Sequence, residues 1–147
     1  MCAKPRTVRA RSPQGSLFVD PAPDPPIPMA DHAYRATRAA LDILKEVEFR
    51  NSCLPEGANK LEVGLGLCTG EVLVGNFGSA DFKDFTLIGN PVNLASRLDG
   101  ANKELNTRVL ISEETFRMLE GRIPCHDQGE ISIRGWSGGV RVYEPYG

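Results

Sequence analysis

The chain has 147 residues, of which 41% are hydrophobic and 24% charged, a composition typical of one globular domain with one core. A formal net charge of -2 gives no reason to expect nucleic acid or an acidic membrane surface as a partner. The sequence has no apolar run of the length that crosses a bilayer.

The first 30 residues differ in composition from the rest. Lys4, Arg6, Arg9 and Arg11 precede the first acidic residue, Asp20, and seven of the eleven prolines also fall in this segment. Such a composition is typical of chain that buries little apolar surface. We therefore expect residues 1–30 to form a Pro-rich basic tail, disordered or irregular, and residues 31–147 to form the folded domain.

From Asp31 onward, hydrophobic periodicity predicts helices interleaved with short strands. In chain order, the expected elements are a helix from the capping residue Asp31 to about Val47, a hairpin of strands 61–67 and 72–75 with a tight turn at 69–71, a strand over 85–88, a helix from about Pro91 to about Leu105, a strand over 108–111, a helix capped by Ser112, and strands over 131–133 and 140–143. This order predicts an α+β sandwich with helices packed against a mixed sheet.

The four cysteines, at positions 2, 53, 68 and 125, are scattered along the chain. They form no C-x-x-C pair and lie beside no histidine-rich cluster, which argues against a zinc site. Scattered thiols are typical of proteins in a reducing compartment. We expect a cytoplasmic protein in which Cys68 and Cys125 are small core residues.

The segment around residue 90 carries the clearest chemical signal. A strand-like run ends at Gly89, and Pro91 suits the first turn of a helix. Asn93 and Arg97 follow four residues apart, so both side chains leave one face of that helix. An amide and a guanidinium presented together can orient a hydroxyl and neutralise charge on a phosphorus. The same spacing also occurs as a polar pair on an ordinary surface helix.

Four glycines fall within the segment from Gly66 to Gly78. Glycines near strand ends most often serve turns or the close approach of two backbones. No helix start follows directly and no G-K-[ST] is present, so the segment is a weak signal for a phosphate loop. We expect a structural role for these glycines.

Three motifs, taken together and in this order, resemble the class III adenylate/guanylate cyclase catalytic domain. They read H-A-x-R-A-x-R-A-A at 32–40, G-L-x-T-G-E-V-x-V-G at 66–75 and F-T-x-I-G-N-x-V-N-L-A-S-R-L at 85–98. Residues 108–112 and the glycine-rich end before 142–144 are similar to the closing segments of that family. The resemblance covers about residues 31–145.

The resemblance implies a ferredoxin-like α+β sandwich of the nucleotide cyclase type, in which two domains pair head to tail with active sites at their interface. It implies conversion of ATP or GTP into the 3′,5′-cyclic monophosphate and pyrophosphate, a step that asks for metal ions and cationic stabilisation. The family uses Mg²⁺ or Mn²⁺. The expected partners are therefore ATP and a second cyclase domain, either in a homodimer or in a paired domain.

Carried over residue by residue, the resemblance implies roles for three side chains. Asn93 matches the asparagine that holds the ribose, and Arg97 matches the arginine that stabilises the pentavalent α-phosphate. Thr86 matches the position that reads the purine, where Asp or Thr accompanies ATP, so adenine is favoured over guanine. A hydroxyl is only modestly selective, and threonine also suits a strand by propensity alone.

The sequence departs from the family's pattern in two places. The family has two metal-binding aspartates in the N-terminal half of its domain, and we find no counterpart of either in this sequence. In the best register, Ser12 stands where the second aspartate belongs, and Asp20 is expected to be a solvated loop acid. We therefore expect the N-terminal part of the domain to be missing from this chain. Near the other end, the family's K-G-K-G is replaced by residues 134–137. Arg134 could reach a phosphate, but Trp136 cannot replace an ammonium.

Two functions therefore stay open. In the first, the chain is part of an adenylate cyclase domain for intracellular signalling, which contributes Thr86, Asn93 and Arg97 and is inactive alone because the metal ligands come from elsewhere. In the second, it is a non-catalytic cyclase-like module for dimerisation or nucleotide sensing. Metal-dependent binding of an ATP analogue separates the two.

Overall fold

A computed structural model describes residues 4–11, 30–78, 83–133, 136 and 138–147. For residues 4–11, 74–78 and 83–87 it describes the backbone but not the side chains. In chain order, the elements are β1 (Lys4–Arg11), α1 (His32–Ser52), β2 (Leu65–Gly78), β3 (Lys83–Ile88), α2 (Asn90–Leu105), β4 (Val109–Ser112), α3 (Glu113–Leu119), β5 (Cys125–Ser132) and β6 (Gly139–Pro145). They confirm the predicted α+β fold. None of the helices in these ranges combines the length and apolar character that a membrane span requires.

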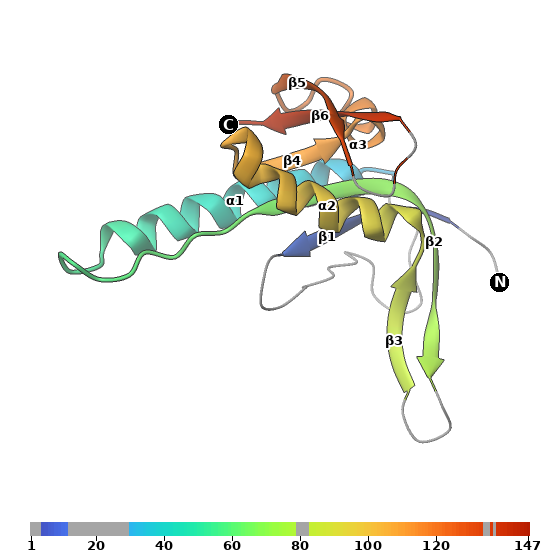
Figure 1. Ribbon diagram of the computed structural model, residues 1–147, viewed down its shortest axis with the longest axis horizontal. Coiled ribbons are helices and arrows are strands. Elements are labelled where there is room, and N and C mark those ends of the chain that lie inside the picture. The colour runs from blue at the N-terminus through green and yellow to red at the C-terminus, as the bar shows by residue number, and fades with distance from the viewer. Residues whose placement is uncertain (1–3, 12–29, 79–82, 134–135, 137) are drawn as a thin grey trace.

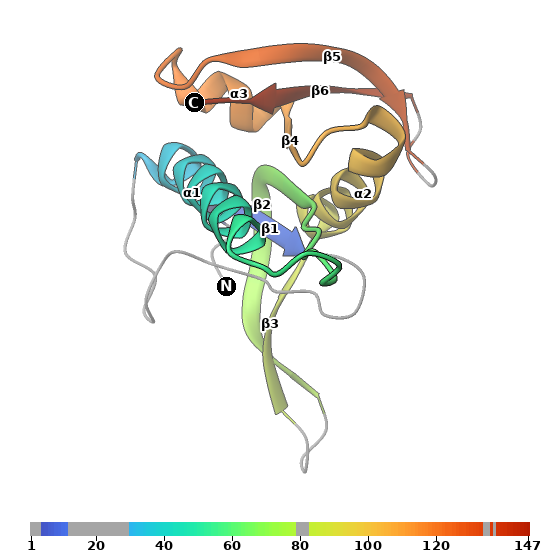
Figure 2. The same ribbon diagram turned by 90° about the vertical axis from the view of Figure 1, so that its left-hand side faces the viewer.

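The strands form one mixed sheet in the order β1-β2-β4-β6-β5, and β3 pairs with β2 outside this path (Figure 1). β2 and β4 are parallel, with Leu65 opposite Val109, and the other pairs are antiparallel. Figure 2 shows α1 and α2 on opposite sides of the sheet. The molecule therefore has a helix layer on each face.

Alternation along β2 explains the two layers, because successive side chains of a strand point to opposite faces. Leu65 and Leu67 are buried with residues of α1 and α3. Cys68 and Val72 are buried with residues of α2, β4 and β6. The predicted core role of Cys68 is confirmed.

α1 forms where the periodicity predicts it and continues to Ser52. Its buried face repeats at helical spacing through Ala33, Ala36, Ala40 and Leu44. Asp31 is the N-cap residue, but the expected capping bond is absent among the described residues. With ψ at 19°, the Asp31 backbone is outside the extended region that suits a cap, and its carboxylate accepts a hydrogen bond from Nε of Arg35 at 2.8 Å instead.

The predicted hairpin of strands 61–67 and 72–75 is wrong, because β2 runs without a turn from Leu65 to Gly78. Gly70, which suggested the turn, has no positive φ. It serves close approach instead, since a Cβ at this position would lie 2.4 Å from Cγ of Pro91 in α2. Leu61, the expected strand start, precedes β2, where its backbone N–H and C=O both bond the side-chain amide of Asn51.

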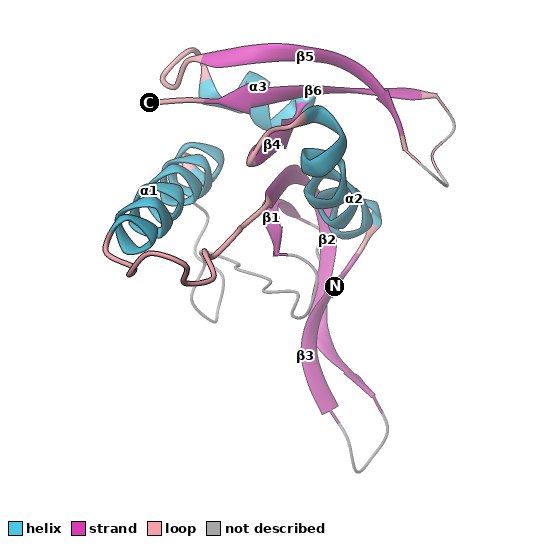
Figure 3. Ribbon diagram, turned by 60° about the vertical axis from the view of Figure 1, so that its left-hand side comes forward, coloured by secondary structure: helices cyan, strands magenta, loops and turns pink. Residues whose placement is uncertain are grey.

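Beyond Val72, β2 continues as a two-stranded ribbon with β3, from Leu73 opposite Ile88 to Gly78 opposite Lys83. The ribbon projects from the body of the molecule (Figures 1 and 3). At its base, the Leu73 and Ile88 side chains are 43% and 47% exposed. The predicted strand at 85–88 is confirmed and leads directly into α2.

Residues 4–11 correct part of the predicted tail. They form β1, antiparallel to β2 from Lys4 opposite Val72 to Arg11 opposite Leu65. The edge of β2 offers backbone hydrogen-bonding groups, and a short segment containing Thr7 and Val8 can satisfy them. The rest of the predicted tail, residues 12–29, lies outside the described residues, and the domain boundary at residue 31 stays a prediction.

The C-terminal elements follow the sequence pattern. Ser112 ends β4 and caps α3, where its Oγ accepts a hydrogen bond from the backbone N–H of Thr115 at 3.3 Å. β5 begins earlier than predicted, at Cys125, because its pairing with β6 extends from Pro145 to Gly139. Cys125 is partly buried and packs against the α1 side of the core, which agrees with its predicted role.

Candidate functional site

The candidate site is built on α2, which begins directly after the ribbon. Gly89 is its N-cap residue and Pro91 lies in its first turn, as predicted. The inward face of the helix is buried; it consists of Leu94, Ala95, Leu98, Asp99 and Asn102. Because these residues recur every three or four positions, they fix which face of α2 points outward.

Asn93 and Arg97 both lie on the outward face and are exposed. They are separated by one helical turn, about 5 to 6 Å along the axis. The predicted juxtaposition of an amide and a guanidinium is therefore present on one exposed helix face.

Arg97 differs from the other arginines whose side chains the structure describes. Each of those forms an ion pair with a carboxylate; they are Arg35, Arg38, Arg50, Arg108, Arg117, Arg122 and Arg141. Within the described ranges, the side chain of Arg97 has no ion pair or hydrogen bond, and neither does the side chain of Asn93. The outer face of α2 thus presents a cation that no described carboxylate neutralises.

An exposed arginine and asparagine side by side can make specific hydrogen bonds to a ligand. The guanidinium is a planar fork of donors that matches the oxygens of a phosphate, and it stays charged at any physiological pH. The carboxamide of asparagine can donate and accept at once, as a ribose hydroxyl requires. An arrangement of this kind suits a phosphorylated ligand that also carries hydroxyl groups.

Thr86 lies on β3, where its backbone is opposite Gly75 of β2. The strand ends two residues later at Ile88 and passes through Gly89 into α2. The chain therefore brings Thr86 to the element that precedes Asn93 and Arg97. The side chain of Thr86 lies outside the description, so its role in reading the purine stays a prediction.

The last predicted site residue, Arg134, also lies outside the described residues. Its neighbour Trp136 is 36% exposed, and the Trp136 backbone N–H donates to the carbonyl of Ile133 at 3.0 Å. Ile133 is buried in the core that α2 closes. The backbone of Trp136 is thereby bonded to a residue of that core.

The described residues contain no group of three His, Cys, Asp or Glu side chains that could hold a metal ion. Ser12, at the position of the second aspartate, and Asp20, the expected loop acid, lie outside the described residues. The side chains that the structure does describe therefore do not fit the divalent metal that this kind of chemistry uses.

The buried thiol beneath α2 is not a reactive group. Burial raises the pKa of Cys68 to about 11, and burial also raises the pKa of Cys125 to about 11. A thiol with such a pKa is neutral at physiological pH and is a poor nucleophile. Both cysteines are thus core residues rather than part of the site.

Sequence reasoning missed two buried polar residues on the inward face of α2. Asp99 and Asn102 are 5% and 2% exposed, although the periodicity places them among apolar neighbours. The signal was available, because Asn102 follows Leu94 and Leu98 at intervals of four. A polar residue at a buried helix position needs hydrogen-bond partners, but the sequence does not say which.

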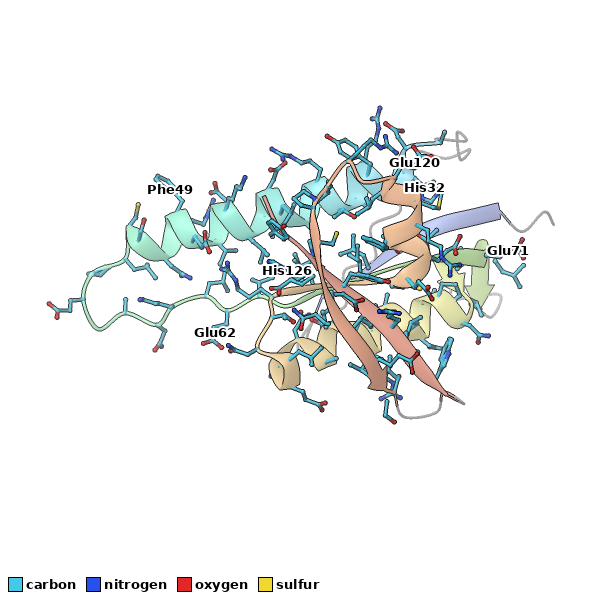
Figure 4. The ribbon with its side chains drawn as sticks, turned by 90° about the horizontal axis from the view of Figure 1, so that it is seen from above. His32, Phe49, Glu62, Glu71, Glu120 and His126 are labelled. Carbon is cyan, nitrogen blue, oxygen red and sulfur yellow. The ribbon has the colours of Figure 1, made fainter. Side chains whose placement is uncertain are left out.

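A second set of exposed apolar side chains lies on α1 and on the segment that follows it. It consists of Phe49, Leu54 and Leu61, which are 65%, 40% and 46% exposed. Figure 4 shows Phe49 on α1 pointing away from the sheet, whereas Glu71 lies at the opposite end of the molecule, where α2 begins. Phe49 and the start of α2 therefore lie on separate surfaces.

Comparison with known proteins supports the sequence resemblance. Residues 22–144 match the family model described as the adenylate and guanylate cyclase catalytic domain. The chain is 32% identical over 123 residues to adenylate cyclase 1 of Rhizobium meliloti, which is 82% of this chain and 18% of that protein. It is 38% identical over 95 residues to an adenylate cyclase of Anabaena cylindrica, which is 60% of this chain and again 18% of that protein. The chain thus spans less than a fifth of these relatives.

Solved structures agree. A bacterial light-regulated adenylyl cyclase is similar with a TM-score of 0.70 at 25% identity, covering 80% of this chain and 34% of that one. A dimeric guanylyl cyclase domain from the aquatic fungus Blastocladiella emersonii is similar with a TM-score of 0.59 at 23% identity, covering 78% of this chain and 58% of that one. These likenesses confirm the predicted nucleotide cyclase type of fold.

Proposed function

Because this chain belongs to the adenylate and guanylate cyclase catalytic domain family, we propose that it acts as an adenylate cyclase domain, forming 3′,5′-cyclic AMP and pyrophosphate from ATP. The observation that carries the proposal is the outer face of α2. There Asn93 and Arg97 are exposed one turn apart, and among the described residues neither side chain has a partner.

In the proposed reaction, the ribose 3′-oxygen attacks the α-phosphorus. A bond forms between these atoms, the bond from the phosphorus to the pyrophosphate oxygen breaks, and the hydroxyl proton passes to water. Arg97 stabilises the charge that develops on the α-phosphoryl oxygens, because its two parallel N–H groups match them. Asn93 holds the ribose through its amide, which keeps the 3′-oxygen in line for attack.

Two observations favour ATP as the substrate. The curated relatives described above are adenylate cyclases. The residue at the purine-reading position is Thr86, whose hydroxyl can accept a hydrogen bond from the adenine amino group. Arg134, which follows β5 in the sequence, is proposed to contact the outer phosphates.

The domain is proposed to act with a second cyclase domain, in a homodimer or a paired assembly. The family generally uses divalent metal ions, Mg²⁺ or Mn²⁺ here, and the described residues offer no set of ligands for one. We therefore propose that, in a paired assembly, a second domain with its own metal-binding residues supplies these ligands. Leu73 and Ile88, exposed and adjacent across the ribbon, offer an apolar contact for that partner.

Calorimetric titration with a non-hydrolysable ATP analogue and Mn²⁺ tests the proposal. We expect binding that Arg97→Ala weakens at least tenfold, since a charge-assisted contact to phosphate is lost. The matched control is Arg117→Ala, which removes an exposed arginine that is already paired with Glu113 at 2.8 Å, and should change the affinity less than twofold. Equal affinities of the two variants would argue against the site.

A second candidate function is a non-catalytic cyclase-like module for dimerisation or nucleotide sensing. Trp136, in place of a lysine of the family, and the lack of a metal-binding group among the described residues favour it. Such a module would bind the analogue without dependence on Mn²⁺, or not at all. We expect the purified chain alone to form no cyclic AMP with Mg²⁺ or Mn²⁺, and robust production would contradict the proposed need for a partner.

A further inference from the structure

The direction in which the Asn93 and Arg97 side chains point depends on the position of α2. Among the described residues, no hydrogen bond or ion pair holds either side chain, so only the helix itself sets their positions. A helix turns by about 100° per residue, so a small rotation or a slip along the sheet would redirect both groups. A site of this kind therefore needs contacts that hold α2 in one position on β2.

Close contact with two glycines of β2 is the first interaction that holds α2 in position. A Cβ at Gly66 would lie 2.2 Å from the carbonyl oxygen of Ala95 and 2.6 Å from the backbone nitrogen of Asp99. A Cβ at Gly70 would lie 2.4 Å from Cγ of Pro91. The helix thus rests directly on the backbone of β2 both before and after the turn that carries Asn93. Contacts of this type set the distance between α2 and β2, but they do not fix the rotation of α2 or its position along the strand.

Asn102 provides a directional interaction between α2 and β2. It is 2% exposed, and its Nδ2 donates to the carbonyl oxygen of Leu65 on β2 at 3.0 Å. The same nitrogen lies 3.3 and 3.2 Å from the carbonyl oxygens of Leu98 and Asp99 in its own helix. An amide NH₂ has two hydrogens, so Asn102 can bond β2 and α2 at once. A buried hydrogen bond of this kind tolerates little displacement.

We infer that Asn102 is a positioning residue for the nucleotide site: by bonding the backbone of β2, it fixes the register of α2 and so aims Asn93 and Arg97. It touches no substrate, because it lies on the inward face of the helix, nine residues and about 13 Å from Asn93 along the axis. The consequence for nucleotide binding rests on the proposed function, whereas the effect on the helix does not.

A plain structural role is the alternative. Asn102 also closes the end of α2, because its carbonyl accepts hydrogen bonds from the backbone N–H groups of Asn106 and Thr107, and its Oδ1 accepts one from Oγ1 of Thr107 at 2.9 Å. If this were its whole function, loss of the Thr107 bond should have the same effect as loss of the Asn102 side chain.

Two variants separate these roles. Asn102→Leu removes both the bond to Leu65 and the bond from Thr107 while keeping the branched shape of the side chain, whereas Thr107→Val removes only the bond to Oδ1 at the end of the helix. Backbone amide exchange and ¹H–¹⁵N spectra, including the Arg97 Nε signal, report the state of the distant part of α2. We expect exchange at 94–98 to rise at least tenfold and the Arg97 signal to shift in Asn102→Leu, with neither change in Thr107→Val.

The nucleotide arm uses the ATP analogue with Mn²⁺. Asn102→Leu should weaken its binding about tenfold and Thr107→Val less than twofold. Changes confined to residues 100–107 in both variants would overturn the inference and leave Asn102 as a helix-end residue. If the wild-type chain binds no nucleotide, the proposed function fails, but the exchange data still decide whether Asn102 fixes α2. If Asn102→Leu does not fold, Asn102→Ser should show the same pattern with smaller changes.

Discussion

The two long helices of this protein cover opposite faces of one sheet, but their exposed arginines differ in ion pairing. On α1, Arg35, Arg38 and Arg50 each pair with a carboxylate one turn away. On α2, Arg97 has no ion pair within the described ranges. Oppositely charged residues one turn apart on a surface helix can pair and stabilise it slightly. The contrast favours the interpretation in which Arg97 awaits a charged group from outside the chain.

The inward faces differ as well. α1 packs through side chains, with Ala36, Ala40 and Leu44 buried against Leu65 and Leu67. α2 also touches the strand backbone directly, at Gly66 and Gly70. Side-chain packing adapts to small shifts, whereas contact with a backbone leaves little room. The helix that carries the candidate site is thus the more tightly positioned of the two.

The largest expected effect comes from blocking that contact. Gly66→Ala places a Cβ within 2.2 to 2.6 Å of backbone atoms of α2, so the helix must move. We expect a loss of about 3 kcal/mol in the free energy of unfolding, as for a severely overpacked core. Urea denaturation measures it. The control is Gly100→Ala on α2, which meets nothing within 4 Å and should stabilise the protein by up to about 1 kcal/mol.

A second test concerns the apolar surface beside each helix. Leu73→Asp, at the base of the ribbon, should weaken self-association at least tenfold, because a charge cannot be buried in a contact between two domains. Phe49→Asp, on α1, removes a more exposed apolar side chain and should leave self-association unchanged. Sedimentation equilibrium distinguishes them. Equal effects of both variants would contradict the assignment of the ribbon as the interface.

The core beneath α2 has an expected pH dependence. Burial raises the pKa of Cys68 from its ordinary 9.0 to about 11, so the unfolded chain ionises this thiol first as the pH rises. Its contribution to stability is complete below pH 9 and is lost between pH 9 and about 11. From about pH 8 to about pH 10, the unfolding free energy should fall about 1 kcal/mol further in the wild type than in Cys68→Ala.

The smallest effect is expected on α1. Arg50 is 72% exposed and pairs with Glu46 at 2.8 Å. Ion pairs of this kind contribute little, so Arg50→Ala should change the free energy of unfolding by less than about 0.5 kcal/mol. A loss above about 1 kcal/mol in urea denaturation would show that the α1 pairs are structural, and would weaken the contrast with α2.

The sequence was sufficient to predict α2 and the outward placement of Asn93 and Arg97, because a helical period and a linked set of motifs both point there. It was not sufficient for β2. Gly70 reads as a turn when only its neighbours are considered, and its actual partner, Pro91, lies 21 residues further along the chain. Likewise, the role of Asn102 depends on the carbonyl of Leu65, 37 residues away. Contacts of this range are properties of the assembled fold.

The central claim is that Asn93 and Arg97 are presented to a nucleotide shared with a second domain. The direct test mixes this chain with a homologous cyclase domain that retains its metal-binding aspartates but has alanine in place of its own asparagine and arginine on the matching helix. We predict that the mixture forms cyclic AMP, that Arg97→Ala lowers the rate by roughly 10²–10³, and that Arg117→Ala leaves it within about twofold. The same rate with Arg97→Ala as with the wild-type chain, or no cyclic AMP from the wild-type mixture, would contradict the account.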